Sequence, residues 1–176
     1  MANGTLKVGT ITTSSGSGNI TIGSGVTVNV NRPAFEAYLS ANQAISDSVL
    51  TKVQHDTEVF DTDGCYDSTT NYRFTPTEPG KYYVYVVHSV SAANATEMVT
   101  TYNYIRKNGS TYKFNVLGMN GNYGTVFDVV VTATVDMNGT TDYLEAATYA
   151  DVSANTPTVQ GSAYKRTYFG AYKIGV

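Results

Sequence analysis

The chain has 176 residues, a formal net charge of −3 and only 14% charged residues, with 16 glycines, 15 tyrosines, no tryptophan and one cysteine. A single domain of this length buries roughly 70% of the surface of its unfolded chain, so no disulfide or metal is needed for folding. The longest basic runs are two residues and no apolar run approaches the ~20 residues that span a bilayer, which argues against nucleic acid as a partner and against membrane insertion. Because Cys65 has no second cysteine to pair with, we interpret it as an incidental thiol of a chain folded in a reducing cytosol.

Residues 1–31 differ in composition from the rest and are predicted to form an N-terminal stem. They contain short alternating stretches such as Leu6–Val8, Ile20–Ile22 and Val26–Val30, separated by segments rich in Gly and Ser. Such strands leave an apolar face that about 30 residues cannot cover alone. We therefore expect either a small collar made by several copies or, alternatively, a flexible leader. The first residues lack the basic and apolar regions of a signal peptide, so no export is expected.

Residues 32–176 are predicted to form one all-β head domain. Strand-forming runs alternate with Gly, Asn, Asp and Pro turns, and Asn-Gly between such runs is the strongest short hairpin signal. Eight to ten strands at this spacing are typical of a β-sandwich or jelly roll. The predicted strands are 34–39, 51–60, 71–75, 81–90, 99–106, 111–117, 125–135, 141–149 and 166–174.

The order of several motifs resembles the globular heads of complement component 1q and of its tumour-necrosis-factor relatives. Residues 51–87 carry a valine-containing strand, a Tyr-Asp loop, Phe-Thr-Pro, a Pro-Gly turn and an aromatic strand. The remaining matches are the opening strand at 33–37, Lys-Asn-Gly within 104–109, the strand pair within 129–145 and a Phe-Gly closing strand at 168–172. The resemblance implies a ten-stranded jelly roll that assembles as a homotrimer through aromatic and aliphatic side chains.

Alternation within the aromatic strands gives separate support for association. Adjacent strand residues point to opposite faces, so one core cannot hide both Tyr82 and Tyr83, and some rings must meet water or another chain. The predicted trimer interface comprises Phe35, Tyr83, Tyr85, Tyr168, Phe169 and Tyr172.

No catalytic set is visible, and we predict that the chain is not an enzyme. Only His55 and His88 could act as a base, and His55 is followed in its strand by Asp56, which should point the opposite way. The acidic stretch 61–67 could offer oxygens to a cation such as Ca²⁺, but its Asp-Gly pair is equally a hairpin turn. We therefore predict neither a metal nor a cofactor. The Asn-x-Ser/Thr sequences at Asn94 and elsewhere are interpreted as coincidental.

These features lead to the hypothesis of a bacteriophage virion protein, a short trimeric fibre or a capsid decoration protein made in the host cytoplasm. Polar loops at 89–96, 119–124 and 153–164 could contact a host surface glycan or protein. Two alternatives are the receptor-binding tip of a tail fibre and a secreted trimeric receptor ligand of the complement component 1q type. The residues predicted to attach the stem to capsid or tail proteins are Leu6, Val8, Ile11, Ile20 and Ile22.

Overall fold

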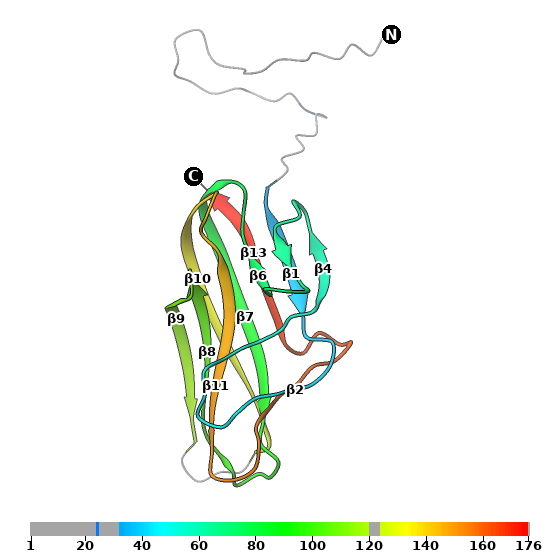
Figure 1. Ribbon diagram of the computed structural model, residues 1–176, viewed down its shortest axis with the longest axis vertical. Coiled ribbons are helices and arrows are strands. Elements are labelled where there is room, and N and C mark those ends of the chain that lie inside the picture. Colours follow the sequence, from blue (N-terminus) through cyan, green and yellow to red (C-terminus); the bar gives the residue numbers. More distant parts are fainter. Residues whose placement is uncertain (1–23, 25–31, 120–123, 176) are drawn as a thin grey trace. The chain divides into compact units, whose positions relative to one another are not determined.

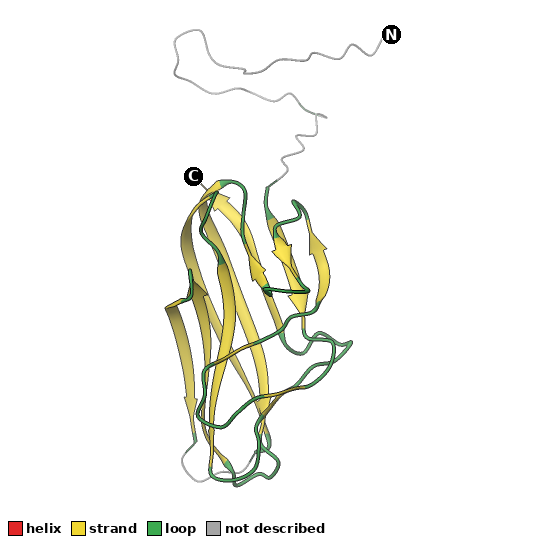
Figure 2. Ribbon diagram, viewed as in Figure 1, coloured by secondary structure: helices red, strands yellow, loops and turns green. Residues whose placement is uncertain are grey.

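The computed structural model describes residue 24 and residues 32–119 and 124–175. The predicted attachment residues Leu6, Val8, Ile11, Ile20 and Ile22 lie outside this part, so the role assigned to them stays a prediction. The described head domain is made of strands, turns and loops, and its strands form two antiparallel sheets (Figures 1 and 2). The expected all-β jelly-roll sandwich is therefore confirmed. No helix in the described part is long and apolar enough to cross a membrane.

Sheet A is organised around the long strand β7, which pairs with β10 on one side and with β13 and β12 on the other. From β13 the sheet continues through β1 to β4, and β12 carries the short strand β2. The strands are β1 (Ala34–Tyr38), β2 (Gln43–Ala44), β4 (Thr57–Asp61), β7 (Pro79–Ser91), β10 (Val126–Asn138), β12 (Thr158–Val159) and β13 (Tyr168–Gly175).

Sheet B has the order β5-β6-β11-β8-β9, and β3 also pairs with β11. Strands distant in sequence lie next to each other in both sheets, as in Greek-key folds. The strands are β3 (Thr51–Lys52), β5 (Tyr66–Asp67), β6 (Arg73–Phe74), β8 (Met98–Lys107), β9 (Ser110–Gly118) and β11 (Leu144–Val152).

The predicted Asn-Gly hairpin joins β8 to β9. Asn108 and Gly109 both have positive φ angles, of 52° and 76°, which is the combination that a two-residue type I′ turn requires. Asn108 also ties the turn to β11, because its Oδ1 accepts a hydrogen bond from the Tyr143 N–H at 2.9 Å. The local turn chemistry thus sets the register of two strands of sheet B.

Aromatic rings fill the space between the sheets at one end of the sandwich. The ring of Phe35 stacks on those of Tyr66 and Phe74, with centroid distances of 4.5 and 4.6 Å, and meets Phe169 edge-on at 4.9 Å. All four side chains are buried. Full burial of each ring contributes on the order of 2–3 kcal/mol before entropy is counted, so these rings form a central part of the core.

Two segments differ from the sequence-based expectation. The predicted strand 51–60 is split into β3, in sheet B, and β4, in sheet A, because the chain crosses between the sheets at 53–56. The predicted strand 141–149 begins at Leu144, since Asn138 Oδ1 accepts hydrogen bonds from three successive backbone N–H groups and holds the preceding residues in a turn. The two-residue strands β5 and β12 are too short for alternation to predict.

Candidate functional site

Four tyrosines form a continuous patch on the outer surface of sheet A. Cross-strand pairing places Tyr83 of β7 opposite Tyr172 of β13. Tyr168 of β13 lies opposite Val87, which is two residues after Tyr85 and on the same face of β7. The ring centroids of Tyr83 and Tyr172 are 5.5 Å apart, and those of Tyr85 and Tyr168 are 6.1 Å apart. We call Tyr83, Tyr85, Tyr168 and Tyr172 the tyrosine face. None of the four is buried in the head domain, and Tyr172 is 46% exposed.

The orientation of Tyr85 within this face is fixed by a glycine and a carboxylate. Gly170 lies opposite Tyr85 in the register, and a Cβ atom at this position would overlap the Tyr85 ring, so only glycine leaves room for it. The Tyr85 hydroxyl donates a hydrogen bond of 2.9 Å to Glu36 Oε2 of β1. Burial and the Glu36 carboxylate both raise the pKa of Tyr85, so the hydroxyl remains a donor at neutral pH.

Two of the six predicted interface residues are corrected by the structure. Phe35 and Phe169 are 0% exposed and point between the sheets, where they pack against each other. A side chain buried in its own domain cannot contact another copy, so these two residues belong to the core. The other four are the tyrosine face, and their role in a trimer stays a prediction.

A second exposed apolar patch, which the sequence analysis missed, runs along one edge of the sandwich. Here β9 ends sheet B and β10 ends sheet A on the same side of the molecule (Figure 1). The two strands are linked by hydrogen bonds from Tyr112 to the Thr134 carbonyl at 2.9 Å and from Asn115 to the Val130 carbonyl at 2.8 Å. Tyr112, Phe114 and Val116 of β9, which we call the edge strip, are 43–51% exposed. In the sequence, the Tyr-x-Phe-x-Val alternation of residues 112–116 is the pattern that indicates an apolar face on this strand.

His55 and His88 lie in the interior and not in a cleft. Both side chains are 0% exposed, their ring centroids are 5.2 Å apart, and the part of the chain that the structure describes provides no carboxylate bonded to either ring. Asp56 points the other way, as predicted, and accepts hydrogen bonds from Ser40. Desolvation lowers the pKa of His55 to about 3 and that of His88 well below 6.5, so both rings are neutral at pH 7.

The tautomer of His88 follows from its neighbour. The Asn103 side-chain nitrogen donates to the Val129 carbonyl, which turns Asn103 Oδ1 toward His88 Nδ1 at 3.1 Å. Since an amide oxygen only accepts, His88 Nδ1 carries the proton and Nε2 is left as an acceptor without a partner among the described groups. Neither histidine is therefore placed to activate a substrate, and both are structural.

The acidic stretch 61–67 is folded around its own backbone. Asp61 Oδ2 accepts the Tyr66 N–H at 2.8 Å, and the Asp67 carboxylate accepts the N–H groups of Thr69, Thr70 and Asn71. Within residues 32–119 and 124–175 no group of three or more His, Cys, Asp or Glu side chains converges on a common point. Cys65 is buried in this segment, and desolvation raises the pKa of its thiol, which disfavours the thiolate.

Two of the predicted contact loops meet through Glu97. Its Oε1 accepts hydrogen bonds from the side-chain amides of Asn94 and Asn155, at 2.6 and 2.7 Å, and its carbonyl accepts the Ser153 N–H at 2.8 Å. The third predicted contact loop is 119–124, of which residues 120–123 lie outside the described part. Thr125, just after it, is held beside the first loop because its carbonyl accepts a hydrogen bond from the Ala92 N–H. The loops thus share one end of the head domain, while their contact with a host stays a prediction.

Comparison with solved structures identifies the fold. The chain is similar to the Eiger TNF of S. frugiperda, with 12% identity, 83% of this chain and 94% of that chain covered, and a TM-score of 0.58. It is also similar to murine APRIL (13% identity, 81% and 99% covered, TM-score 0.58) and to the globular domain of zebrafish complement 1qA (15% identity, 81% and 97% covered, TM-score 0.54). No protein-family model and no curated protein sequence matches. The head domain therefore has the jelly-roll fold shared by the TNF and complement 1q globular heads.

Proposed function

We propose that the chain is a non-enzymatic surface protein of a bacteriophage virion, a short fibre or a capsid decoration, whose head domain acts as a homotrimer. The observation that carries the trimer is the tyrosine face. Four neighbouring aromatic side chains on an otherwise regular sheet are suited to an interface, because tyrosine combines a large apolar ring with a hydroxyl that tolerates partial hydration.

Closed threefold assembly requires two different patches on each copy, since the contact is heterologous and repeats around the axis. The tyrosine face lies on β7 and β13, whereas the edge strip lies on β9. We propose that the edge strip of one copy packs on the tyrosine face of the next. Both patches consist mainly of aromatic and aliphatic side chains, so their contact buries apolar area, while the Glu36 carboxylate beside the tyrosine face keeps its hydrogen bond from the Tyr85 hydroxyl.

The trimer is tested by a charge placed on the tyrosine face. Tyr172→Asp should weaken self-association at least about 30-fold, as expected for loss of an interfacial hot spot of 2 kcal/mol or more. The domain should still fold, because Tyr172 is 46% exposed. Analytical ultracentrifugation over a concentration series gives the association constant, and circular dichroism checks the fold.

Tyr164→Asp is the matched control for this experiment. Tyr164 is 96% exposed and lies in the loop before β13, so the same substitution should leave association unchanged. Equal effects of the two substitutions, or no effect of Tyr172→Asp, would show that the tyrosine face is not an interface.

The virion role is supported by the composition of the chain, including that of the predicted stem at residues 1–31. Once released by lysis, a particle protein must persist outside the cell without disulfides, and a β-rich trimer does so because folding and association stabilise each other. Mixing purified chain with particles that lack it, followed by sedimentation, tests attachment. The full chain should co-sediment and a chain beginning at residue 32 should not. Absence of binding by the full chain to capsids and tails would refute the virion role while leaving the trimer untouched.

A secreted receptor ligand is the second candidate, supported by the similarity of the fold to TNF and APRIL domains. It predicts export and glycans at Asn94 or Asn108. In the structure both amides are engaged, Asn94 with Glu97 and Asn108 with Asp142 at 2.7 Å, so a glycan would have to break these bonds. Mass spectrometry of the protein from its natural source distinguishes the two candidates.

A further inference from the structure

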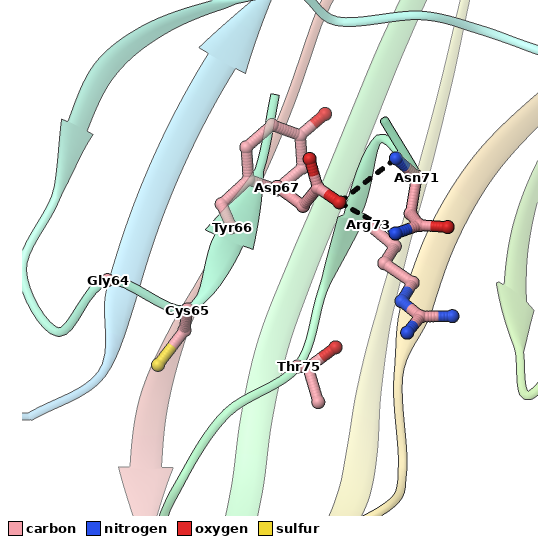
Figure 3. A pocket seen from close by; sticks show the side chains of 7 residues that line it. All are labelled: Gly64, Cys65, Tyr66, Asp67, Asn71, Arg73 and Thr75. Carbon is pink, nitrogen blue, oxygen red and sulfur yellow. Dashed lines mark hydrogen bonds between the residues drawn. The ribbon is translucent and has the colours of Figure 1, made fainter. Parts of the chain in front are cut away.

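A polar pocket of about 310 Å³ opens beside the short β5–β6 hairpin of sheet B. Its volume lies at the lower end of the range for small-molecule sites, which suits a single small ligand. Figure 3 shows that the lining residues come from both strands, from the loop between them and from the segments that flank the hairpin. The lining residues are Gly64, Cys65, Tyr66, Asp67, Asn71, Arg73 and Thr75.

Asp67 is already saturated and is not the group that binds a ligand. Its Oδ1 accepts the N–H groups of Thr69 and Thr70, at 3.0 and 2.9 Å, and its Oδ2 accepts the Asn71 N–H and side-chain amide, at 3.0 and 2.7 Å. These donors compensate much of its negative charge and hold its pKa far below the ordinary value. Asp67 therefore organises the loop at 68–71.

Arg73, by contrast, presents a positive charge to the pocket without a carboxylate partner in the part of the chain described. It lies opposite Asp67 in the hairpin, yet the Asp67 carboxylate is turned into the loop at 68–71 and is bonded there. The guanidinium instead lies over the ring of Tyr143, 4.6 Å from its centroid. This stacking restricts the side chain while leaving its in-plane N–H donors available.

The rest of the pocket adds groups of known polarity. Because the Asn71 side-chain nitrogen donates to Asp67, the free end of that amide is the oxygen, which can accept a hydrogen bond. Thr75 contributes a hydroxyl that can donate or accept. The pocket thus combines a planar cation, one oriented acceptor and one adaptable hydroxyl.

We propose that this pocket binds a small sugar bearing a carboxylate, of the uronic-acid type. A carboxylate matches the fork of Arg73, because two parallel N–H···O bonds can form. A sugar hydroxyl can donate to the Asn71 oxygen, and another can bond to Thr75. A neutral sugar would leave the Arg73 charge unmatched, and a simple inorganic anion would leave the Asn71 oxygen without a donor. The inference does not depend on the trimer or on the virion role.

Titration of the full chain with sodium glucuronate, followed by NMR of backbone amides, tests the proposal. We expect saturable shifts confined to residues near 64–75 and 143, with glucose and sodium phosphate each binding at least about tenfold more weakly, because each offers only part of the chemistry. Equal binding of glucose would refute the role of the carboxylate, and equal binding of phosphate would refute recognition of the sugar. Absence of shifts with glucuronate would refute the site.

Substitutions assign the role of Arg73. Arg73→Gln should weaken glucuronate binding at least about tenfold, and Arg73→Lys should weaken it less, since lysine keeps the charge but loses the fork. Arg166→Gln removes the same charge from an exposed loop position and should leave binding unchanged. Thermal unfolding shows whether each variant is folded. If Arg73→Gln is not folded, the binding of glucuronate by Arg73→Lys is compared with that of the unchanged chain. Unchanged binding in folded Arg73→Gln would overturn the proposal.

Discussion

Replacing Phe169 by aspartate is expected to abolish folding of the head domain. Phe169, the second residue of β13, is 0% exposed, and its ring contacts those of Phe35 and His55 at centroid distances of 4.9 and 5.7 Å. A carboxylate at this position would be buried without a partner. Burying the charged form costs more than the roughly 5–15 kcal/mol that stabilises a typical domain, and the alternative is a buried carboxyl group that stays protonated. We expect insoluble protein or the loss of any cooperative unfolding transition by circular dichroism.

A milder substitution at the same position provides a quantity that can be measured. Phe169→Ala should fold but lose about 3–5 kcal/mol of unfolding free energy, because it leaves a cavity among the core rings. The exposed Tyr164→Asp variant serves as the control and should change stability by less than about 0.5 kcal/mol. A soluble Phe169→Asp variant with normal unfolding would mean that the residue does not occupy the core.

Acidification is expected to destabilise the head domain steeply below pH 6.5 through His55 and His88. Desolvation lowers the pKa of both buried rings, that of His55 to about 3, whereas in the unfolded chain both return to about 6.5. The unfolded state therefore binds more protons below pH 6.5, so stability is complete above this pH and falls as the pH is lowered. His55 alone contributes about 1.4 kcal/mol per pH unit below pH 6.5, or about 2 kcal/mol at pH 5, and His88 acts in the same direction.

Denaturant unfolding at several pH values measures this effect. The window between pH 4.5 and 6.5 separates the histidines from carboxylates such as Asp67 and Asp142, whose pKa values in the fold are lowered by hydrogen bonds and which lose stabilisation only at more acid pH. NMR of the native imidazoles is the control, since their signals should remain those of neutral rings at pH 5. Constant stability from pH 7.5 to 5, or native titration near pH 6.5, would contradict the burial of the pair.

The strands of the fold could be predicted because local signals agree with the final structure. The Asn108-Gly109 turn needs two positive φ angles, and the runs on either side alternate with the period of a strand. Alternation also assigns Tyr168 and Tyr172 to one face of β13 and Phe169 to the other. Placing Phe169 in one interface with Tyr168 and Tyr172 therefore disagrees with the alternation itself, although alternation does not say which of the two faces is inside. Only the packing of β13 against Phe35 decides this.

The sites that depend on distant segments could not be predicted. His55 follows β3, at the crossover between the sheets, and His88 belongs to β7, so nothing in the local sequence indicates that their rings meet. The pocket at Arg73 depends on two-residue strands and on Tyr143, which lies just before β11. Such short segments carry no periodicity, and their geometry is set by the loop bonds of Asp67 and by tertiary packing.

The mass of the full chain in solution, measured by sedimentation equilibrium across the micromolar range, tests the central proposal most directly. We predict a species of three times the 18.9 kDa chain mass that persists on dilution, since the tyrosine face and the edge strip would otherwise remain in contact with water. A folded species of 18.9 kDa throughout the series would contradict the trimer and, with it, the function proposed for the tyrosine face.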